Sequence, residues 1–325
     1  MEKSKYKLSI SIVTYNHQNF IRECLQSVVE QECDFDFEVV VGDDYSTDNT
    51  RSILMRFAEK YPNMIKLLFQ KSNVGYDKNL QDVINMCTGE YIANIDGDDG
   101  ALPLKFIKQL DFLEKHKDCS MCFHNLRLII DGSMGKHYNN PLDENTSVVN
   151  INEFVNQGLA HWGNASKMYR RSALPKEGFK SFECIPDQHF HLQIARNGKV
   201  AYLNEVLGFY RKHSQGISVI NRNKDKIECA LNDLVRTYRY AKDYGVEKEI
   251  ADRRISFVYY DAACQYLMLN DYIKFKHYIT KSNENFIFFN TKHRICFILK
   301  DLPRVLFFLK TLNNYVYRIR GKQII

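Results

Sequence analysis

The chain has 325 residues, of which 45% are hydrophobic and 26% are charged, a composition typical of a folded globular protein. The formal net charge is +6, but residues 271–325 contain 11 Lys and Arg against 3 Asp and Glu, so the first 270 residues carry a net charge of −2. Because the positive charge belongs to the last segment, the main part of the chain is not expected to bind nucleic acid.

The nine cysteines and the N-terminal residues indicate the cellular compartment in which we expect the protein. Nine is an odd number, the spacing is not that of a disulfide framework, and the first ten residues contain no apolar signal-peptide core. Both features favour reduced thiols and a cytoplasmic location. Cys119 and Cys122 form an isolated C-x-x-C, which we expect to be buried strand residues rather than a zinc or redox site. No uncharged apolar run of 18 residues occurs, so no membrane-spanning helix is expected.

Two hydrophobic periods alternate along the first 130 residues. Strands are expected at 7–16, 37–44, 64–70, 90–96 and 119–130, with helices at 19–31, 46–61, 76–89 and 103–116. Repeated β-α-β units of this length predict an α/β fold with a doubly wound, mostly parallel sheet.

The remaining residues are less regular. After a loop-rich stretch at 131–165, we expect a short strand at 165–171, a helix at 186–198, and strands at 199–204 and 206–213. From about residue 222 the pattern is helical, with a helical hairpin at 257–282 that turns at Asn270 and Asp271.

Polar side chains gather where three of the predicted strands end. They are Thr14, Tyr15 and Asn16 at the end of the first strand, Asp43 and Asp44 at the end of the second, and Asp96, Asp98 and Asp99 at and just beyond the end of the fourth. In open parallel sheets, ligands bind beyond the carboxyl ends of the strands. Carboxylates crowded at that edge indicate a cation, and a Mg²⁺ or Mn²⁺ ion held by few protein ligands keeps free positions for phosphate oxygens.

Other nucleotide or metal sites do not fit these residues. The turn "TYNHQN" after the first strand lacks the glycines of a dinucleotide-binding or P-loop site. A calcium loop that starts at Asp96 would need glycine at its sixth position, where Ala101 stands. A divalent ion that neutralises a departing diphosphate is the remaining chemistry, and it suits transfer from a nucleoside-diphosphate donor.

Three segments resemble the family-2 glycosyltransferases with a GT-A fold, over roughly residues 7–215. They are "SIVTYNHQNFIRECLQSVVEQ", "FEVVVGDDYSTDNT" and "NVGYDKNLQDVINMCTGEYIANIDGDD", the last followed by Pro103 in a D-x-D-D-x-x-x-P pattern. The resemblance implies a GT-A catalytic domain at 1–216, with a nucleotide-binding half at 1–100 and an acceptor half at 101–216. A helical, basic C-terminal extension would then occupy 217–325.

The resemblance also implies roles for individual residues. On the donor side, the nucleotide-binding residues would be Thr14, Tyr15 and Asn16 against the nucleobase, the Asp43–Asp44 pair, whose second acid Asp44 would hydrogen-bond the base, and Asp96 near the ribose. Asp98 and His213 would ligate Mn²⁺ or Mg²⁺, and Asp99 would lie toward the donor sugar. Asp187 is the implied catalytic base. Because Pro186 stands where many members have an acidic residue, Glu183 is the alternative base. Trp162, the single tryptophan, either forms an apolar surface beneath an acceptor sugar or packs in the core.

The implied activity is metal-dependent, inverting transfer of a hexosyl or N-acetylhexosaminyl group from a nucleotide sugar, with UDP as the expected nucleotide. The acceptor would be a glycan or lipid-linked glycan in the synthesis of a surface polysaccharide such as capsule or O-antigen. One alternative is a sugar nucleotidyltransferase, which would need a glycine-rich basic loop after the first strand. Another is a non-catalytic carbohydrate- or partner-binding protein on the same fold.

The basic C-terminal residues mix Lys and Arg with Phe, Leu and Ile. One helical side would carry Ile295, Ile298, Leu299, Leu302, Leu306 and Leu309, although Pro303 favours two helices over one. A basic amphipathic segment of this kind can lie on an anionic membrane. We therefore expect a peripheral location on the inner face of the cell membrane, and the alternative is packing on protein.

Overall fold

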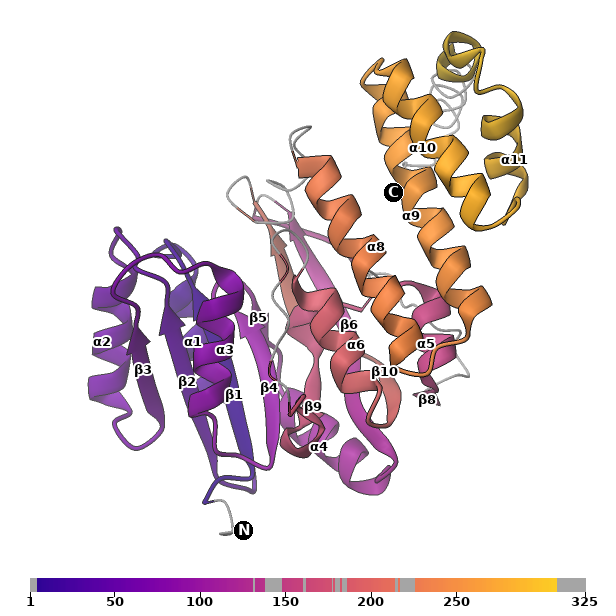
Figure 1. Ribbon diagram of the computed structural model, residues 1–325. Coiled ribbons are helices and arrows are strands. Elements are labelled where there is room, and N and C mark those ends of the chain that lie inside the picture. Colours follow the sequence, from indigo (N-terminus) through magenta and orange to yellow (C-terminus); the bar gives the residue numbers. More distant parts are fainter. Residues whose placement is uncertain are drawn as a thin grey trace. The chain divides into compact units, whose positions relative to one another are not determined.

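A computed structural model describes residues 5–130, 132–137, 148–159, 162–176, 178, 182, 186–213, 216 and 226–308 (Figure 1). The chain divides into two units, Met1–Arg222 and Asn223–Ile325. The boundary expected after residue 216 adjoins the interval 217–225, which lies outside the described residues, so that boundary and the two expected halves stay predictions.

The first unit is built on one sheet with the strand order β3-β2-β1-β4-β9-β6-β10-β5. Its strands are β1 Leu8–Thr14, β2 Phe37–Asp43, β3 Ile65–Phe69, β4 Tyr91–Asp96, β5 Gly100–Ala101, β6 Cys119–Ile130, β9 Met168–Arg170 and β10 Lys199–Lys212. Neighbours among β1 to β4 pair in parallel, as do β6 and β10, whereas β9 runs antiparallel to β4 and β6. The predicted α/β fold with a mostly parallel sheet is confirmed.

Helices cover both faces of this sheet. They are α1 Ile21–Val29, α2 Thr50–Lys60, α3 Tyr76–Met86, α4 Lys105–Lys115, α5 Ile151–Gln157 and α6 Pro186–Ala195. Helices α1, α2 and α4 share one apolar core with β2 residues Val39 and Val41. Because side chains alternate along a strand, Gly42 faces the other side, where an added Cβ would lie 2.3 Å from Val83 of α3. Helix α3 therefore packs closely on the opposite face.

Three local features of the structure differ from the prediction made from the sequence. Helix α5 lies in a stretch expected to be loop, and a capping box between Asn150 and Glu153 starts it. The same stretch contains two short antiparallel strands, β7 Ser133–His137 on β6 and β8 Val148–Val149 on β10. The two strands expected at 199–213 form one strand, β10, whose pairing with β6 is irregular between Leu203 and Gly208.

The second unit is helical, as expected. It contains α8 Ile227–Asp243, α9 Lys248–Met268, α10 Tyr272–Asn285 and α11 Thr291–Ile298. The predicted hairpin turn lies between α9 and α10, where Asn270 has a left-handed φ of 59°. The Asp271 side chain accepts a hydrogen bond from the Lys274 N–H and caps α10.

The cysteines only partly follow the expectation of reduced thiols. Cys119 and Cys122 are free and buried in β6, as the sequence predicts. Cys229, near the start of α8, takes part in a disulfide bond. The expectation of reduced thiols throughout the chain is therefore wrong at this position.

Glu38, in β2, is a buried charge that joins three segments of the first unit. Its carboxylate accepts hydrogen bonds from Ser9 Oγ at 2.6 Å, from Lys66 Nζ at 2.6 Å, and from Thr88 N and Oγ1 at 2.7 Å each. Burial alone would raise the pKa of Glu38, but the hydrogen bonds from Lys66, Ser9 and Thr88 outweigh it and lower this pKa.

We predict that Glu38→Gln lowers the unfolding free energy at pH 7 by about 2 kcal/mol, because it removes the charged acceptor. A carboxylate with a lowered folded-state pKa stabilises the fold above its unfolded-state pKa of about 4.3, and this stabilisation disappears as the pH falls through the folded-state value. Urea unfolding across this pH range should show the deficit shrinking in acid. Glu59→Gln, at an exposed α2 position, is the control. A deficit that is absent, or equal at every pH, would contradict the prediction.

Candidate active site

Three turns leave the sheet at one edge, where β1, β2 and β4 end. Thr14 pairs in register with Asp43, and Val13 pairs with Asp96. The Gly97 N–H continues the ladder by donating to the Val13 carbonyl at 2.9 Å. The polar clusters expected at this edge therefore lie beside one another.

The first turn is tied to the second by Asn16. Asn16 has a left-handed φ of 55°, its N–H donates to Ser46 Oγ at 2.9 Å, and its side-chain oxygen accepts from the Thr47 N–H at 2.8 Å. Thr14 is buried, whereas Tyr15 is 44% exposed. Of the three residues expected at the nucleobase, Tyr15 thus offers the most accessible side chain.

The carboxylates of Asp43 and Asp44 hold neighbouring loops. Asp43 is buried and forms an ion pair with Arg51 at 2.5 Å. Asp44 accepts the backbone N–H groups of Val74 at 2.7 Å and Gly75 at 2.9 Å, one on each oxygen. A carboxylate oxygen can accept a second hydrogen bond, so a nucleobase contact at Asp44 stays a prediction.

Asp96 is held by two residues that the sequence did not point to. Its carboxylate accepts the Tyr76 hydroxyl at 3.1 Å and the Asn164 side-chain N–H at 3.1 Å. Burial and the nearby charge of Asp98 raise the pKa of Asp96 to about 6, although the hydrogen bond from Asn164 acts in the opposite direction.

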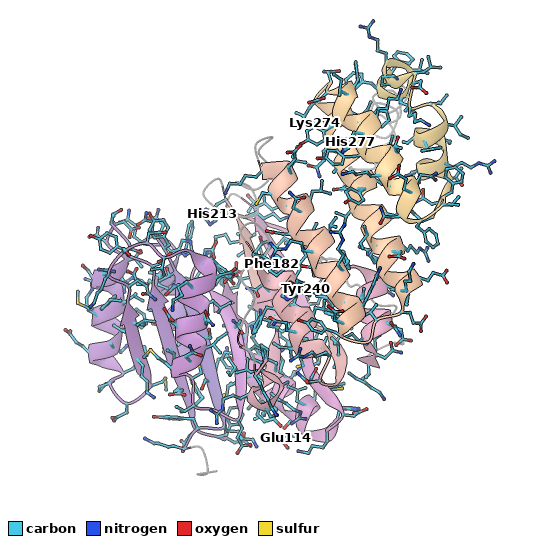
Figure 2. The ribbon with its side chains drawn as sticks, viewed as in Figure 1. Glu114, Phe182, His213, Tyr240, Lys274 and His277 are labelled. Carbon is cyan, nitrogen blue, oxygen red and sulfur yellow. The ribbon has the colours of Figure 1, made fainter. Side chains whose placement is uncertain are left out.

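Asp98 and His213 meet where β4 and β10 end. His213 Nε2 and Asp98 Oδ2 are 2.9 Å apart, and both side chains remain partly exposed. Figure 2 shows His213 at the upper end of the first unit and Glu114 at its opposite end. Burial opposes the charge on Asp98, but the hydrogen bond from His213 lowers its pKa below the usual value.

His17, which the sequence analysis passed over, lies beside this pair. Single ligand atoms of His17, Asp98 and His213 all lie within 4.8 Å of one another. Carboxylate oxygen and imidazole nitrogen are both common ligands of divalent ions. His17 Nδ1 is also a buried polar atom that has no hydrogen-bond partner among the residues that the structure describes. The donor set at this edge therefore fits the divalent ion that the resemblance implied.

Asp99 is buried and is held by β10. Its side chain is fully buried, and its carboxylate accepts the Arg211 N–H at 2.8 Å. Burial and the charges of Asp98 and Asp96 raise the pKa of Asp99 well above its usual range. This carboxyl group fastens β10 to the turn after β4, and contact with a donor sugar stays a prediction.

Arg211 holds the same turn from its other side. Its guanidinium donates to the Asp98 carbonyl at 2.7 Å and to Glu23 at 2.8 Å, and it stacks on the rings of Phe20 and Phe209. The side chain is 8% exposed. Arg211 thereby fixes the backbone that presents Asp98.

Asp187 lies in the first turn of α6, and burial raises its pKa. The ammonium group of Lys167 opposes this shift and also interacts electrostatically with Asp96. Lys167 is fully buried, where its Nζ contacts the Asn164 side-chain oxygen and lies 3.3 Å from His191 Nε2. Lys167 therefore interacts electrostatically with both Asp187 and Asp96, and it is a further residue that the sequence analysis missed.

Two weaker assignments end differently. Glu183, the alternative base, lies outside the described residues. Trp162 is 1% exposed and packs among Phe123, Phe154 and Tyr202. This packing favours the second of the two alternatives for Trp162, a place in the core.

Comparison with known proteins connects this geometry to a family. The family profile described as Glycosyl transferase family 2 matches residues 9–178. An uncharacterized protein of Mycobacterium tuberculosis is 32% identical over 222 residues, which cover 65% of this chain and 60% of the relative. The chain thus matches less than two thirds of that relative's length.

Solved structures share the fold. S. aureus TarS, determined in complex with UDP-GlcNAc, aligns with a TM-score of 0.66 at 19% identity, over 98% of this chain and 93% of that chain. A mannosyltransferase from Pyrobaculum calidifontis, determined with GDP-Man and Mn²⁺, aligns with a TM-score of 0.59 at 16% identity, over 95% of this chain and 87% of that chain. The chain belongs to glycosyltransferase family 2 and has the GT-A fold.

Proposed function

We propose that this chain transfers a sugar from a nucleotide-sugar donor to an acceptor hydroxyl, with inversion at the anomeric carbon and a divalent ion on the donor diphosphate. The observation that carries the proposal is the convergence of Asp98 and His213 at the carboxyl edge of the sheet, beside Asp96. Membership of glycosyltransferase family 2 supports it.

The donor that we propose is a UDP-sugar carrying a hexosyl or N-acetylhexosaminyl group. The likeness to TarS, whose structure contains UDP-GlcNAc, supports uridine as the nucleoside. Tyr15 is exposed at the end of β1, where its ring could lie against a nucleobase. Asp96, at the end of the adjacent β4, would then face the ribose.

The ion, when bound, would neutralise negative charge on the departing diphosphate. Asp98 and His213 would hold it, Arg211 would keep the Asp98 backbone in place, and Asp187 would accept the proton of the acceptor hydroxyl. The acceptor oxygen would form the new bond to the anomeric carbon while the bond from that carbon to the diphosphate breaks. A raised pKa suits a general base that works near neutral pH.

The acceptor that we propose is a glycan or lipid-linked glycan in the synthesis of a surface polysaccharide such as capsule or O-antigen. Base catalysis at Asp187 requires a hydroxyl group that can reach the start of α6. This part of the proposal rests on the family resemblance.

We predict that Asp187→Asn lowers the transfer rate by about 10²–10⁴, because the amide cannot accept the proton, and leaves donor affinity nearly unchanged. The wild-type rate should fall as the pH drops through the raised pKa of Asp187. Steady-state transfer assays and donor titrations measure the two quantities. Asp111→Asn, at an exposed α4 position, is the control. If Asp187→Asn keeps more than a tenth of the rate, Asp187 is not the base.

We further propose that the second unit rests on the cytoplasmic face of an anionic membrane. Among the described residues, no helix is long and apolar enough to span a membrane. Ile295 and Ile298 of α11, with Leu302 and Val305 just beyond it, are between 44% and 62% exposed, and we call them the C-terminal stripe. Leu306, expected on the same side, is buried instead.

Exposed basic side chains accompany the C-terminal stripe. Lys292, Arg294 and Arg304 are exposed in the same segment, and residues 271–325 carry a net charge of +8. Apolar side chains beside Lys and Arg fit the interface of a bilayer that contains anionic lipids. This charge complementarity favours a membrane over a protein partner.

We predict that the full chain sediments with phosphatidylglycerol vesicles at low salt and is released at high salt. The double substitution Ile298→Asp with Leu302→Asp should weaken this binding at least about tenfold, because it removes two apolar side chains from the interface. Ile273→Asp, at an α10 position that is 85% exposed but outside the stripe, is the matched control. If both variants bind phosphatidylglycerol vesicles equally well, or if the wild type binds neutral vesicles equally well, membrane docking by the stripe is disproved.

A further inference from the structure

The metal-binding edge contains a third candidate ligand from a third segment of the chain. His17 follows β1, Asp98 follows β4 and His213 follows β10, yet single ligand atoms of the three lie within 4.8 Å of one another. The separation of His213 from Asp98 is 2.9 Å, the spacing of two ligands on one ion of this size. A small inward movement of the three side chains would bring their ligand atoms within bonding distance of one ion.

The backbone holds His17 in this position. The His17 carbonyl accepts the N–H groups of Phe20 and Ile21, both at 2.9 Å, so the residue is fixed at the start of α1. A Cβ at position 97 would lie 2.7 Å from Thr14 Oγ1 and 3.0 Å from His17 Nδ1. Only glycine at 97 lets the turn that presents Asp98 come this close to His17.

One ring nitrogen of His17, the buried Nδ1, has no hydrogen-bond partner among the described residues. Burying an imidazole nitrogen without a partner is unfavourable, and an ion coordinated by Nδ1 itself would supply that partner. The rings of Phe20 and His213 lie edge-on to the His17 ring, with centroids 6.2 Å away in each pair.

We propose that His17 is a protein ligand of the divalent ion, which gives a site of two imidazoles and one carboxylate that selects Mn²⁺ over Mg²⁺. The proposal rests on the proposed function in one respect, namely that an ion binds between Asp98 and His213. Mg²⁺ prefers oxygen ligands and retains several waters, whereas imidazole nitrogen favours transition-metal ions. Three protein ligands leave the remaining coordination positions for diphosphate oxygens.

The test measures metal binding by the full chain without any nucleotide. We expect His17→Ala to weaken Mn²⁺ binding by roughly tenfold or more while Mg²⁺ affinity changes little, so the preference for Mn²⁺ declines. Titration of free Mn²⁺ by its paramagnetic resonance signal, with Mg²⁺ as competitor, gives both affinities. Spin-echo modulation of bound Mn²⁺ should show two coupled imidazole nitrogens in the wild type and one in the variant.

Matched variants separate the possible outcomes. His116→Gln, at an exposed position of the same unit, should leave both affinities unchanged, and thermal melts check that each variant is folded. If Asp98→Asn and His213→Ala abolish Mn²⁺ binding but His17→Ala leaves affinity, selectivity and the nitrogen signal unchanged, the His17 assignment is wrong and the metal-dependent mechanism stands. If none of these variants changes Mn²⁺ binding, the metal site itself is wrong.

Discussion

Three carboxylates within four residues repel one another, and the first unit offsets this repulsion with hydrogen-bond donors from other segments. Asp96 ends β4, and Asp98 and Asp99 follow it. The charges of Asp98 and Asp96 raise the pKa of Asp99 in addition to the effect of burial. Each of the three carboxylates interacts with a different set of hydrogen-bond donors. Only Asp98 is left facing a pair of histidines, which makes it the carboxylate suited to an ion.

The donors come from distant parts of the sequence, so the site depends on the whole sheet. Asp96 is held by Tyr76 of α3 and by Asn164, and Asp99 is held by the backbone of β10. Arg211 of β10 holds the carbonyl of Asp98. Because β10 pairs with β6 far from β4 in strand order, the short strand β5 and these side-chain bonds connect β10 to the turn after β4.

Much of the fold could be predicted from the sequence, because buried parallel strands and amphipathic helices have distinct hydrophobic periods. The antiparallel strand β9 was not placed within the sheet, since three residues carry little periodicity and pairing is a long-range property. Helix α5 was missed because its seven residues are mostly polar. Its capping box, Asn150 with Glu153, was the available local signal.

The candidate site likewise could be predicted only in part from the sequence. Carboxylates at strand ends identified Asp96 and Asp98, whereas His17 and Lys167 gave no local signal, because their roles depend on contacts far along the chain. Asp99 and Trp162 have the residue types of ligand contacts but are buried in the fold. Residue type and spacing therefore indicated where a site lies but not which side chains face it.

The central claim is that the turn after β4 binds the diphosphate of a nucleotide sugar through a divalent ion. Thermal unfolding with a panel of nucleotide sugars, with and without Mn²⁺, tests this most directly. The account predicts that a UDP-sugar stabilises the fold by about 2.7 kcal/mol at a hundredfold excess over its Kd, that Mn²⁺ is required, and that Asp98→Asn abolishes the effect. Equal stabilisation of Asp98→Asn, or none by any nucleotide sugar with any divalent ion, would contradict it.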